Sequence, residues 1–333
     1  ATSHQPSSKH MAILTDRKSL RDYEVIIVGS GAGGGMMAML LSLNGVKVLL
    51  LEAGRNYEPA KETPMFNTPD QAPLRGMGTT ERGFGYYDAT VGGGWQVPGE
   101  PYATKDGSEA EFRWWRPRML GGRTNHWGRI SLRFGEYDFK PKTRDGLGYD
   151  WPISYADLAP YYDKAELMVG IYGSNESLEN TPDSPAGILQ TPPKPRAGEM
   201  LAKKHCRDFS IPIIPVHRAV LSERLNGPER AAKLFPNNPL ARKLVSEDMM
   251  GRAACFWATA CGRGCSIRAN FQSTTVLLPP ALASGNLDII TDVMVREVLL
   301  DKTGKAIGVH YVDKVTRVNS IAKARVVILS AST

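Results

Sequence analysis

The chain has 333 residues, 42% of them hydrophobic and 23% charged, which predicts a globular protein of about two domains. Its net charge of +7 is spread without a dense block of Lys and Arg, so nucleic-acid binding is not indicated. No apolar run reaches the ~18 residues of a transmembrane helix, and residues 1–20 lack the apolar stretch of a signal peptide. A processed mature protein would look the same, so cytoplasmic and periplasmic localisation both stay open.

The first predicted elements form a strand–turn–helix–strand unit. Residues 23–28 are an apolar run rich in β-branched side chains, residues 34–43 carry Met and Leu in a helical pattern, and residues 46–51 are a second apolar run. Near-continuous apolar strands are typical of a parallel sheet that is covered on both faces. The sequence therefore predicts a βαβ unit and an α/β fold.

A glycine-rich turn between the first strand and the helix has the pattern G-x-G-x-x-G. Gly29 permits the tight turn, Gly31 lets the backbone approach a pyrophosphate, and Gly34 lets helix and strand pack closely. Glu52 ends the second strand, where a carboxylate can accept both ribose hydroxyls of an adenosine and would repel a 2′-phosphate. These residues predict a site for NAD or FAD.

The rest of the chain departs from a simple NAD-binding domain. Residues 59–118 are rich in Gly, Pro and aromatic residues without a clear period, which indicates a long loop that covers a cofactor. Ser154 is the predicted N-cap of a helix over residues 155–169. The segment after this helix is punctuated by prolines. A split flavoprotein fold, built around the long FAD molecule, is favoured by this organisation.

Strands are predicted again near the end of the chain. Apolar runs at residues 287–290, 293–300, 306–312 and 325–329 indicate a β-meander that returns to the first domain. The last of these looks like a core strand without the turn that should follow it. We therefore expect an unpaired strand there, completed by a C-terminal segment or by a second chain.

Several motifs resemble the glucose-methanol-choline (GMC) family of FAD oxidoreductases. Similarity is found at residues 25–54, 120–128, 151–162, 289–298 and 326–331. In the second of these motifs the resemblance implies that Gly121, Gly122, Thr124, Asn125 and His126 pass beneath the flavin. It also implies that Val295 meets the adenine through its backbone.

The resemblance implies an FAD-dependent oxidoreductase, with a dehydrogenase favoured over an oxidase. The expected reaction transfers hydride from a CH–OH group of a sugar or another alcohol to flavin N5. Two alternatives stay open: an NAD-dependent dehydrogenase of another fold, and a non-catalytic flavin-binding module completed by a partner chain. None of the six histidines occupies the family's catalytic motif, so the catalytic base is expected in a missing C-terminal part.

The family architecture implies an α/β, Rossmann-like FAD/NAD(P)-binding domain of GMC type with an interleaved α+β substrate domain, lacking its C-terminal third. The expected boundaries are an N-terminal arm at 1–22, the first part of the FAD domain at 23–150, part of the substrate domain at 151–250, a cysteine-containing loop at 251–275 and the returning FAD-domain strands at 276–333.

The segment around His126 resembles pyranose oxidases and bacterial sugar or sugar-acid dehydrogenases. In pyranose oxidases the histidine at this position is bonded to the 8α carbon of the flavin. We therefore predict that His126 is a covalent attachment point. The alternative is a histidine that only hydrogen-bonds near the isoalloxazine.

Three of the four cysteines lie close together in the sequence: Cys255, Cys261 and Cys265. They can be free thiols or include one disulfide; zinc would need a fourth ligand such as Cys206 or His205. Certain sugar dehydrogenases of the resembled family hold a three-iron cluster for electron exit, which would make these cysteines iron ligands. An electron-transfer subunit is the partner that such a cluster implies.

Overall fold

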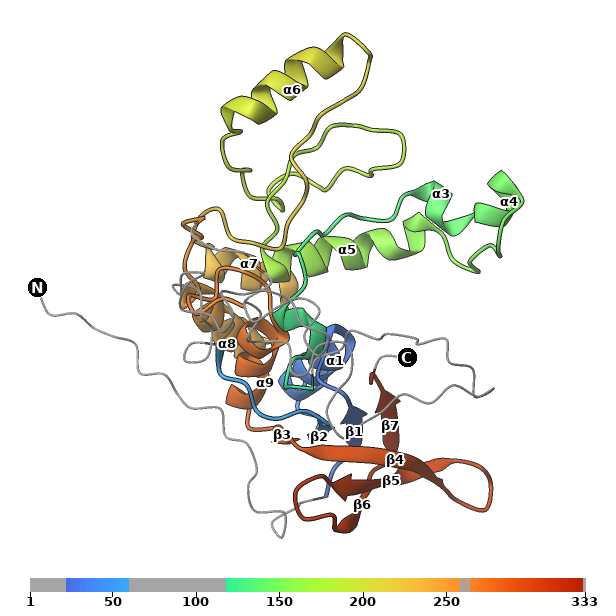
Figure 1. Cartoon of the computed structure of the whole chain (residues 1–333). Coiled ribbons are helices and arrows are strands. Elements are labelled where there is room, and N and C mark those ends of the chain that lie inside the picture. The colour runs from blue at the N-terminus through green and yellow to red at the C-terminus, as the bar shows by residue number, and fades with distance from the viewer. Residues whose placement is uncertain (1–21, 60–117, 258–260, 262–263, 332–333) are drawn as a thin grey trace, which may run out of the picture.

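The computed structural model describes residues 22–59, 118–257, 261 and 264–331 (Figure 1). The predicted N-terminal arm and the predicted cofactor-covering loop lie almost entirely outside these residues. The described helices and strands, in chain order, are β1 (Val25–Val28), α1 (Ala32–Leu43), β2 (Val48–Leu51), the 3₁₀ helix η4 (Gly122–Asn125), α3 (Glu136–Phe139), α4 (Pro141–Asp145), α5 (Tyr155–Val169), α6 (Ala197–Arg207), α7 (Gly227–Leu234), α8 (Pro239–Met250), the π-helix η6 (Ser273–Leu277), α9 (Leu278–Ala283), β3 (Leu287–Ile290), β4 (Val293–Leu300), β5 (Ala306–Asp313), β6 (Asn319–Lys323) and β7 (Val326–Leu329).

A four-stranded parallel sheet with the order β3-β2-β1-β7 forms the centre of the fold. Val25 pairs with Val48 on one side and with Val326 on the other, so β1 is an inner strand. All residues of β1 and β2 are buried. The predicted βαβ unit with buried parallel strands is thereby confirmed, with strands slightly shorter than expected.

The predicted C-terminal meander is only partly correct. β4, β5 and β6 form a separate antiparallel sheet, whereas β3 and β7 join the two edges of the parallel sheet. The last strand is not unpaired, because β7 pairs with β1 along its whole length, but it forms one edge of the described sheet and is paired on one side only. The sequence also failed to indicate β6, in which only Ala322 is buried. A short apolar run does not reveal whether its neighbouring strands are parallel, so the sequence predicts these strands but not their topology.

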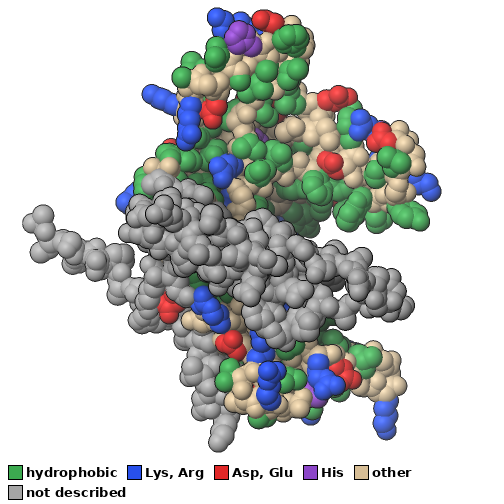
Figure 2. Space-filling view, in the orientation of Figure 1, with side chains coloured by type: hydrophobic (Ala, Val, Ile, Leu, Met, Phe, Trp, Pro, Cys, Tyr) green, Lys and Arg blue, Asp and Glu red, His purple; other side chains and the backbone are tan. Residues whose placement is uncertain are grey.

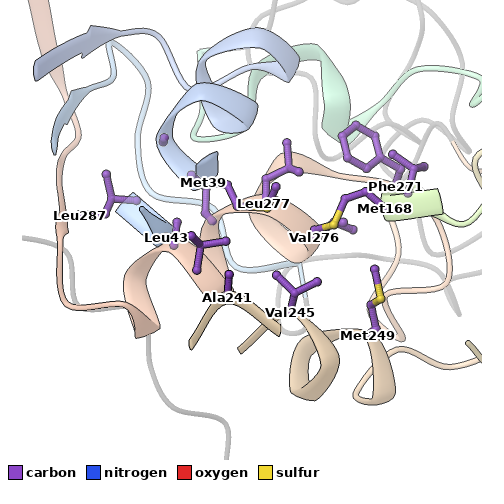
Figure 3. Close-up of a cluster of buried hydrophobic side chains, with 14 of the residues drawn as sticks. Met39, Leu43, Met168, Ala241, Val245, Met249, Phe271, Val276, Leu277 and Leu287 are labelled. Carbon is purple, nitrogen blue, oxygen red and sulfur yellow. The ribbon is translucent and has the colours of Figure 1, made fainter. Parts of the chain in front are cut away.

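Helices cover one face of the parallel sheet. Met39 and Leu43 of α1 pack with Val276 and Leu277 of the η6–α9 segment and with Leu287 of β3 (Figure 3). α8 packs on the outer side of α9. This cluster is the main hydrophobic core, and it positions the start of α1 at the end of β1.

The antiparallel sheet covers the opposite face. Ile26 and Leu49 point into a second buried cluster with Val309 and Tyr311 of β5. Val25 and Ile27, the alternate residues of β1, belong to the first cluster. The period of two along β1 therefore separates the two cores, as a strand requires. The resulting layers are helices, parallel sheet and antiparallel sheet (Figure 1).

The helical part of the chain projects from these layers. The predicted helix at 155–169 is confirmed as α5, and the backbone N–H of Ser154 donates to the Asp157 carboxylate at 2.8 Å. Two arms, one with α3 and α4 and one with α6, extend beyond the layered part (Figure 1). Hydrophobic side chains lie on the surface of the first arm (Figure 2). Leu147 and Tyr149, which follow α4 in the sequence, are exposed. Among the helices that the structure describes, none has the length and apolar character to cross a membrane.

Candidate functional site

A cavity of about 470 Å³ lies at the carboxyl ends of β1 and β2. Its walls come from the turn after β1, the end of β2, the start of β4, the η4 helix and the residues that follow β7. In open α/β sheets this edge is where ligands bind. The cavity therefore joins segments from both ends of the sequence at the place where a dinucleotide is expected.

The glycines of the first motif have different local surroundings. Gly29 has a φ of +95°, and a Cβ there would lie 2.6 Å from the carbonyl oxygen of Ser330. A Cβ on Gly34 would overlap the carbonyl oxygen of Gly29. A Cβ on Gly31 would meet no atom within 4 Å, because this glycine lines the open cavity. Two of the glycines are thus required by the turn itself, and Gly31 is the position where a ligand can approach the backbone.

Glu52 lines the same cavity and is held in place by backbone donors. Its Oε2 accepts from the N–H of Ser30 at 3.0 Å and from the Ser30 hydroxyl, and its Oε1 accepts from the N–H of Gly54 at 2.8 Å. The side chain is buried except for 8% of its surface. The carboxylate is therefore oriented at the cavity wall before any ligand arrives.

The second motif is connected directly to the first. The N–H of Gly121 donates to the hydroxyl of Ser30 at 2.8 Å, and Gly121 and Gly122 have φ values of +88° and +51°. Gly122 and Thr124 line the cavity together with the first motif. Thr124 is fixed by donating to the carbonyl of Gly121 at 2.6 Å. The structure thus brings these predicted residues to one wall of the site.

Asn125 and His126 lie behind this wall and do not line the cavity. Asn125 is fully buried and donates to the carbonyl of Leu120 at 2.8 Å. His126 is also buried, and its burial, together with the charges of Arg129 and Arg123, lowers its pKa to about 4. The imidazole is therefore neutral near pH 7, the form that has a free electron pair for bonding.

Val295 lies in the wall of the same cavity. Val293, Met294 and Val295 of β4 form the cavity wall opposite the glycine turn. The pairing of β4 with β5 is irregular between Val295 and Glu297. A backbone edge of this kind can take part in hydrogen bonds to a planar base.

Three wall residues were not predicted from the sequence. Ser30 holds both Glu52 and Gly121, and Arg118 and Arg123 bring positive charge to the cavity wall. Ser30 is one of the three variable positions within the glycine pattern, so the pattern does not identify it. Arg123 directly follows the Gly121-Gly122 pair where the commonest family form has Ser, and this departure was the available signal.

The three clustered cysteines line a second, small cavity together with Trp257 and Asn270. All four cysteines of the chain are free thiols, and burial raises the pKa of Cys255. In the described part of the chain there is no group of three or more Cys, His, Asp or Glu side chains placed to hold a metal ion. Cys206 and His205 lie on α6 and do not line this cavity, which argues against them as further zinc ligands.

The donors and shape of the main cavity are suitable for FAD. The open space at Gly31 can receive a pyrophosphate at the start of α1, Glu52 offers a carboxylate for a ribose, and β4 offers a backbone edge for adenine. A parallel sheet with such a site defines a dinucleotide-binding flavoprotein. In line with this, a family model described as an FAD binding domain matches residues 22–68.

A second family model, described as GMC oxidoreductase, matches residues 240–333. This match confirms the resemblance to GMC oxidoreductases found in the sequence motifs. Together, the two matches favour FAD over the NAD alternative.

Curated relatives include oxidases and dehydrogenases. The chain is 26% identical to 6'''-hydroxyparomomycin C oxidase of Streptomyces lividus over 94% of this chain and 48% of the relative. It is 27% identical to 2-methyl-1,2-propanediol dehydrogenase of Mycolicibacterium austroafricanum over 93% of this chain and 49% of the relative. It is 32% identical to the fructose dehydrogenase large subunit of Gluconobacter japonicus over 49% of this chain and 29% of the relative. The chain thus spans about half the length of the first two relatives.

Proposed function

We propose that this chain is the FAD-binding part of an oxidoreductase that oxidises a CH–OH group of a sugar or another alcohol. The observation that carries the proposal is the main cavity, in which the glycine turn, Glu52 and the Gly121–Thr124 segment meet although they are far apart in the sequence. The names of the relatives support the class of substrate, because they refer to a hydroxyparomomycin, a propanediol and fructose.

The residues of the chain would share the work of holding the cofactor. Gly31 leaves room for the pyrophosphate at the start of α1, and the carboxylate of Glu52 would accept the ribose hydroxyls. Val295 would present its backbone to the adenine, and Gly122 and Thr124 would support the flavin end. Bound FAD supplies an acceptor for the hydride that leaves the substrate carbon.

Proton removal from the substrate hydroxyl is not assigned to a residue. Among the histidines in the described part of the chain, none lines the main cavity. His217 is buried with its Nε2 2.9 Å from the carbonyl oxygen of Ser174, and His310 lies on β5 near Glu297. Both side chains contact other parts of the protein and not the main cavity, so neither is assigned as the catalytic base.

A flavin spectrum followed by anaerobic reduction tests the proposal. Purified protein should show flavin absorbance, and a sugar or alcohol from a substrate panel should bleach it without oxygen. Protein that binds no flavin would refute the proposal. Flavin that binds tightly and is bleached by dithionite, but by no sugar or alcohol, would favour the non-catalytic module.

We further propose that the protein is a dehydrogenase and not an oxidase. Two relatives are named dehydrogenases, although a third is an oxidase. Comparing the rate of flavin reoxidation by oxygen with that by a quinone or a dye distinguishes the two. Reoxidation by oxygen at the turnover rate would contradict the dehydrogenase assignment.

Covalent attachment of the flavin to His126 is the next part of the proposal. The neutral state of the buried imidazole supports it, because only the unprotonated nitrogen can form the bond to the 8α carbon. Flavin should stay with the protein after acid precipitation and be released from H126A. Full release from the wild-type protein would refute the attachment.

The third part concerns electron exit through the cysteines. Three thiols line one cavity, which is the number of ligands that a three-iron cluster needs, and Arg252 near Cys265 would balance its negative charge. In the described structure these thiols are not placed to hold a metal ion, so they would have to move together to bind the cluster. The fructose dehydrogenase relative is named as a large subunit, which supports an electron-transfer partner. Iron and acid-labile sulfide should copurify with the protein; their absence would leave free thiols as the correct alternative.

A further inference from the structure

Arg129 is one of the most deeply buried charged side chains in the described part of the chain. Its exposure is 0%, and its backbone has a φ of 62°, in the left-handed region. The backbone is fixed by the N–H of Ala219, which donates to the Arg129 carbonyl at 2.8 Å. A buried cation in an unusual backbone conformation indicates that the surrounding structure holds this residue in one orientation.

The guanidinium donates to the end of the η4 helix. Its Nη2 donates to the carbonyl oxygens of Thr124 at 3.1 Å and Asn125 at 2.9 Å, and its Nη1 donates to the carbonyl of Trp127. The last carbonyls of a helix have no partner within the helix, and a cation there is electrostatically favourable. Arg129 therefore acts as a side-chain cap of η4.

The same guanidinium reaches the cysteine-containing loop. Its Nη1 also donates to the carbonyl oxygen of Cys261, a residue that lines the second cavity. One planar fork thus binds four carbonyls, three from the cofactor motif and one from the cysteine loop.

The opposite side of η4 forms the wall of the main cavity. Gly122, Arg123 and Thr124 line the cavity, and the N–H of Gly121 is bonded to Ser30 of the glycine turn. η4 has only four residues, so a rotation of its capped end also moves the residues that line the cavity. Replacement of Arg129 should therefore shift the residues of η4 that line the cofactor site.

A second set of contacts limits how far η4 can move. The N–H of Ser273 donates to the Thr124 hydroxyl at 2.9 Å, and the Thr274 hydroxyl donates to Asn125 at 3.2 Å. These bonds remain when Arg129 is replaced. Loss of Arg129 should therefore tilt η4 and weaken the site without removing the segment from the cavity wall.

We propose that Arg129 is a positioning residue for the cofactor, which sets the orientation of η4 at the cavity and fixes it to the cysteine loop. The inference rests on the proposed FAD site, because the function of the oriented segment is to hold FAD. Arg129 itself does not line the cavity, so its effect is exerted through Thr124 and Asn125.

Arg230 offers a matched control. It is also a buried arginine, and its guanidinium donates to two backbone carbonyls, those of Leu167 at 2.9 Å and Ile188 at 2.8 Å. It does not line the main cavity. R230M therefore measures how much stability is lost when a buried, carbonyl-binding arginine is removed at a place that does not line the cofactor site.

The experiment compares wild type, R129K, R129M and R230M as intact proteins. Three quantities are measured: FAD occupancy over a range of FAD concentrations, the visible circular dichroism of the bound flavin, and the midpoint of thermal unfolding. Visible dichroism reports how the protein surrounds the flavin, so a purely structural role of Arg129 would not change it. R129K keeps the charge but offers one ammonium group in place of the planar fork.

R129M should weaken FAD binding about tenfold or more, which is the effect expected when the tilt of η4 removes at least one hydrogen bond between the site and the charged cofactor. R129K should lie between R129M and wild type and should also change the visible dichroism. R230M should keep wild-type FAD binding and dichroism even where its unfolding midpoint falls. If R129M does not fold, R129K decides the question.

Wild-type binding and dichroism in R129K, or equal losses in R129M and R230M, would overturn the positioning role and leave the proposed FAD site intact. Failure of the wild-type protein to bind FAD would overturn both proposals together. The two failures are therefore distinguishable.

Discussion

Gly31 and Gly34 stand three residues apart in one motif, yet alanine should affect them in opposite ways. At Gly34 an added Cβ would overlap the carbonyl oxygen of Gly29 and lie 2.9 Å from its carbonyl carbon. At Gly31 the same Cβ would meet nothing within 4 Å. We predict that G34A damages the fold and that G31A damages only the binding of FAD.

The magnitude for G34A follows from two opposing effects. Gly34 lies inside α1, where replacement of Gly by Ala favours the helix by about 1 kcal/mol. Overpacking costs about 1–3 kcal/mol when flexible side chains can move aside, and more when they cannot. The obstructing atoms are the backbone of Gly29, whose φ of +95° and contact with Ser330 leave it little freedom. The clash should prevail, with a net loss of about 2 kcal/mol or more in unfolding free energy.

For G31A the unfolding free energy should stay within about 0.5 kcal/mol of wild type, since the site is open. The methyl group would occupy the space next to the backbone that a pyrophosphate needs for hydrogen bonds. Losing one hydrogen bond to a charged group corresponds to about 1.5–3 kcal/mol. FAD binding should therefore weaken about 10- to 150-fold.

Chemical unfolding and FAD titration of both variants test these expectations. G198A is the control, because Gly198 lies in α6 with no atom within 4 Å of an added Cβ and far from the cofactor site in the sequence. It should bind FAD as wild type does, with equal or slightly greater stability. Wild-type FAD affinity in G31A, or wild-type stability in G34A, would refute this division of roles between the two glycines.

Three further predictions concern buried charged or titratable groups. E52Q should lower the free energy of unfolding by about 1–3 kcal/mol and weaken FAD binding. The Glu52 carboxylate accepts hydrogen bonds from backbone and hydroxyl donors, and in E52Q the amide NH₂ would face one of these donors. Unchanged stability and binding would contradict this prediction. Folding lowers the pKa of His126 from 6.5 to about 4. Between pH 6.5 and pH 4 the unfolded chain therefore binds a proton that the folded protein does not, and the free energy of unfolding falls as the pH drops through this range. H126Q should lack this loss, about 2–3 kcal/mol between pH 7 and pH 4.5 in urea unfolding; identical pH dependence in both proteins would count against it. R133M should lower the free energy of unfolding by about 3–5 kcal/mol, because it leaves Glu166 buried without its bidentate partner. K233M, which breaks an exposed ion pair, should lower it by less than about 1 kcal/mol. Equal losses in the two variants would refute this prediction.

Local patterns in the sequence were sufficient for the first half of the fold. The strands around Gly29 and Glu52 and the helix between them follow from apolar periodicity and glycine chemistry, and the cap at Ser154 follows from its distance to Asp157. Each of these features depends on residues that are neighbours in the chain. Sequence patterns are most informative for such local features.

Features that depend on distant residues were not predictable in the same way. The polar strand β6 owes its existence to pairing with β5, and its sequence shows little β pattern of its own. β3 and β7 are short apolar runs that could pair in a parallel or an antiparallel sense. Their parallel pairing depends on distant elements, because β7 pairs with β1 and β3 pairs with β2 and packs against α9. Likewise, a motif does not say which of its side chains face a cavity, so His126 was expected at the site although it lies behind the wall.

The hydroxyl of Ser30 shows how strongly fold and site depend on each other. It donates to Glu52 from the second strand and accepts from Gly121 of the second motif, so one small side chain joins three segments of the cavity wall. The remaining walls, from β4 and from the residues after β7, are added only when the C-terminal strands join the two sheets. Because no segment holds the site alone, binding of FAD must favour the fully paired sheet over any partly folded state, and the cofactor should stabilise both ends of the chain together.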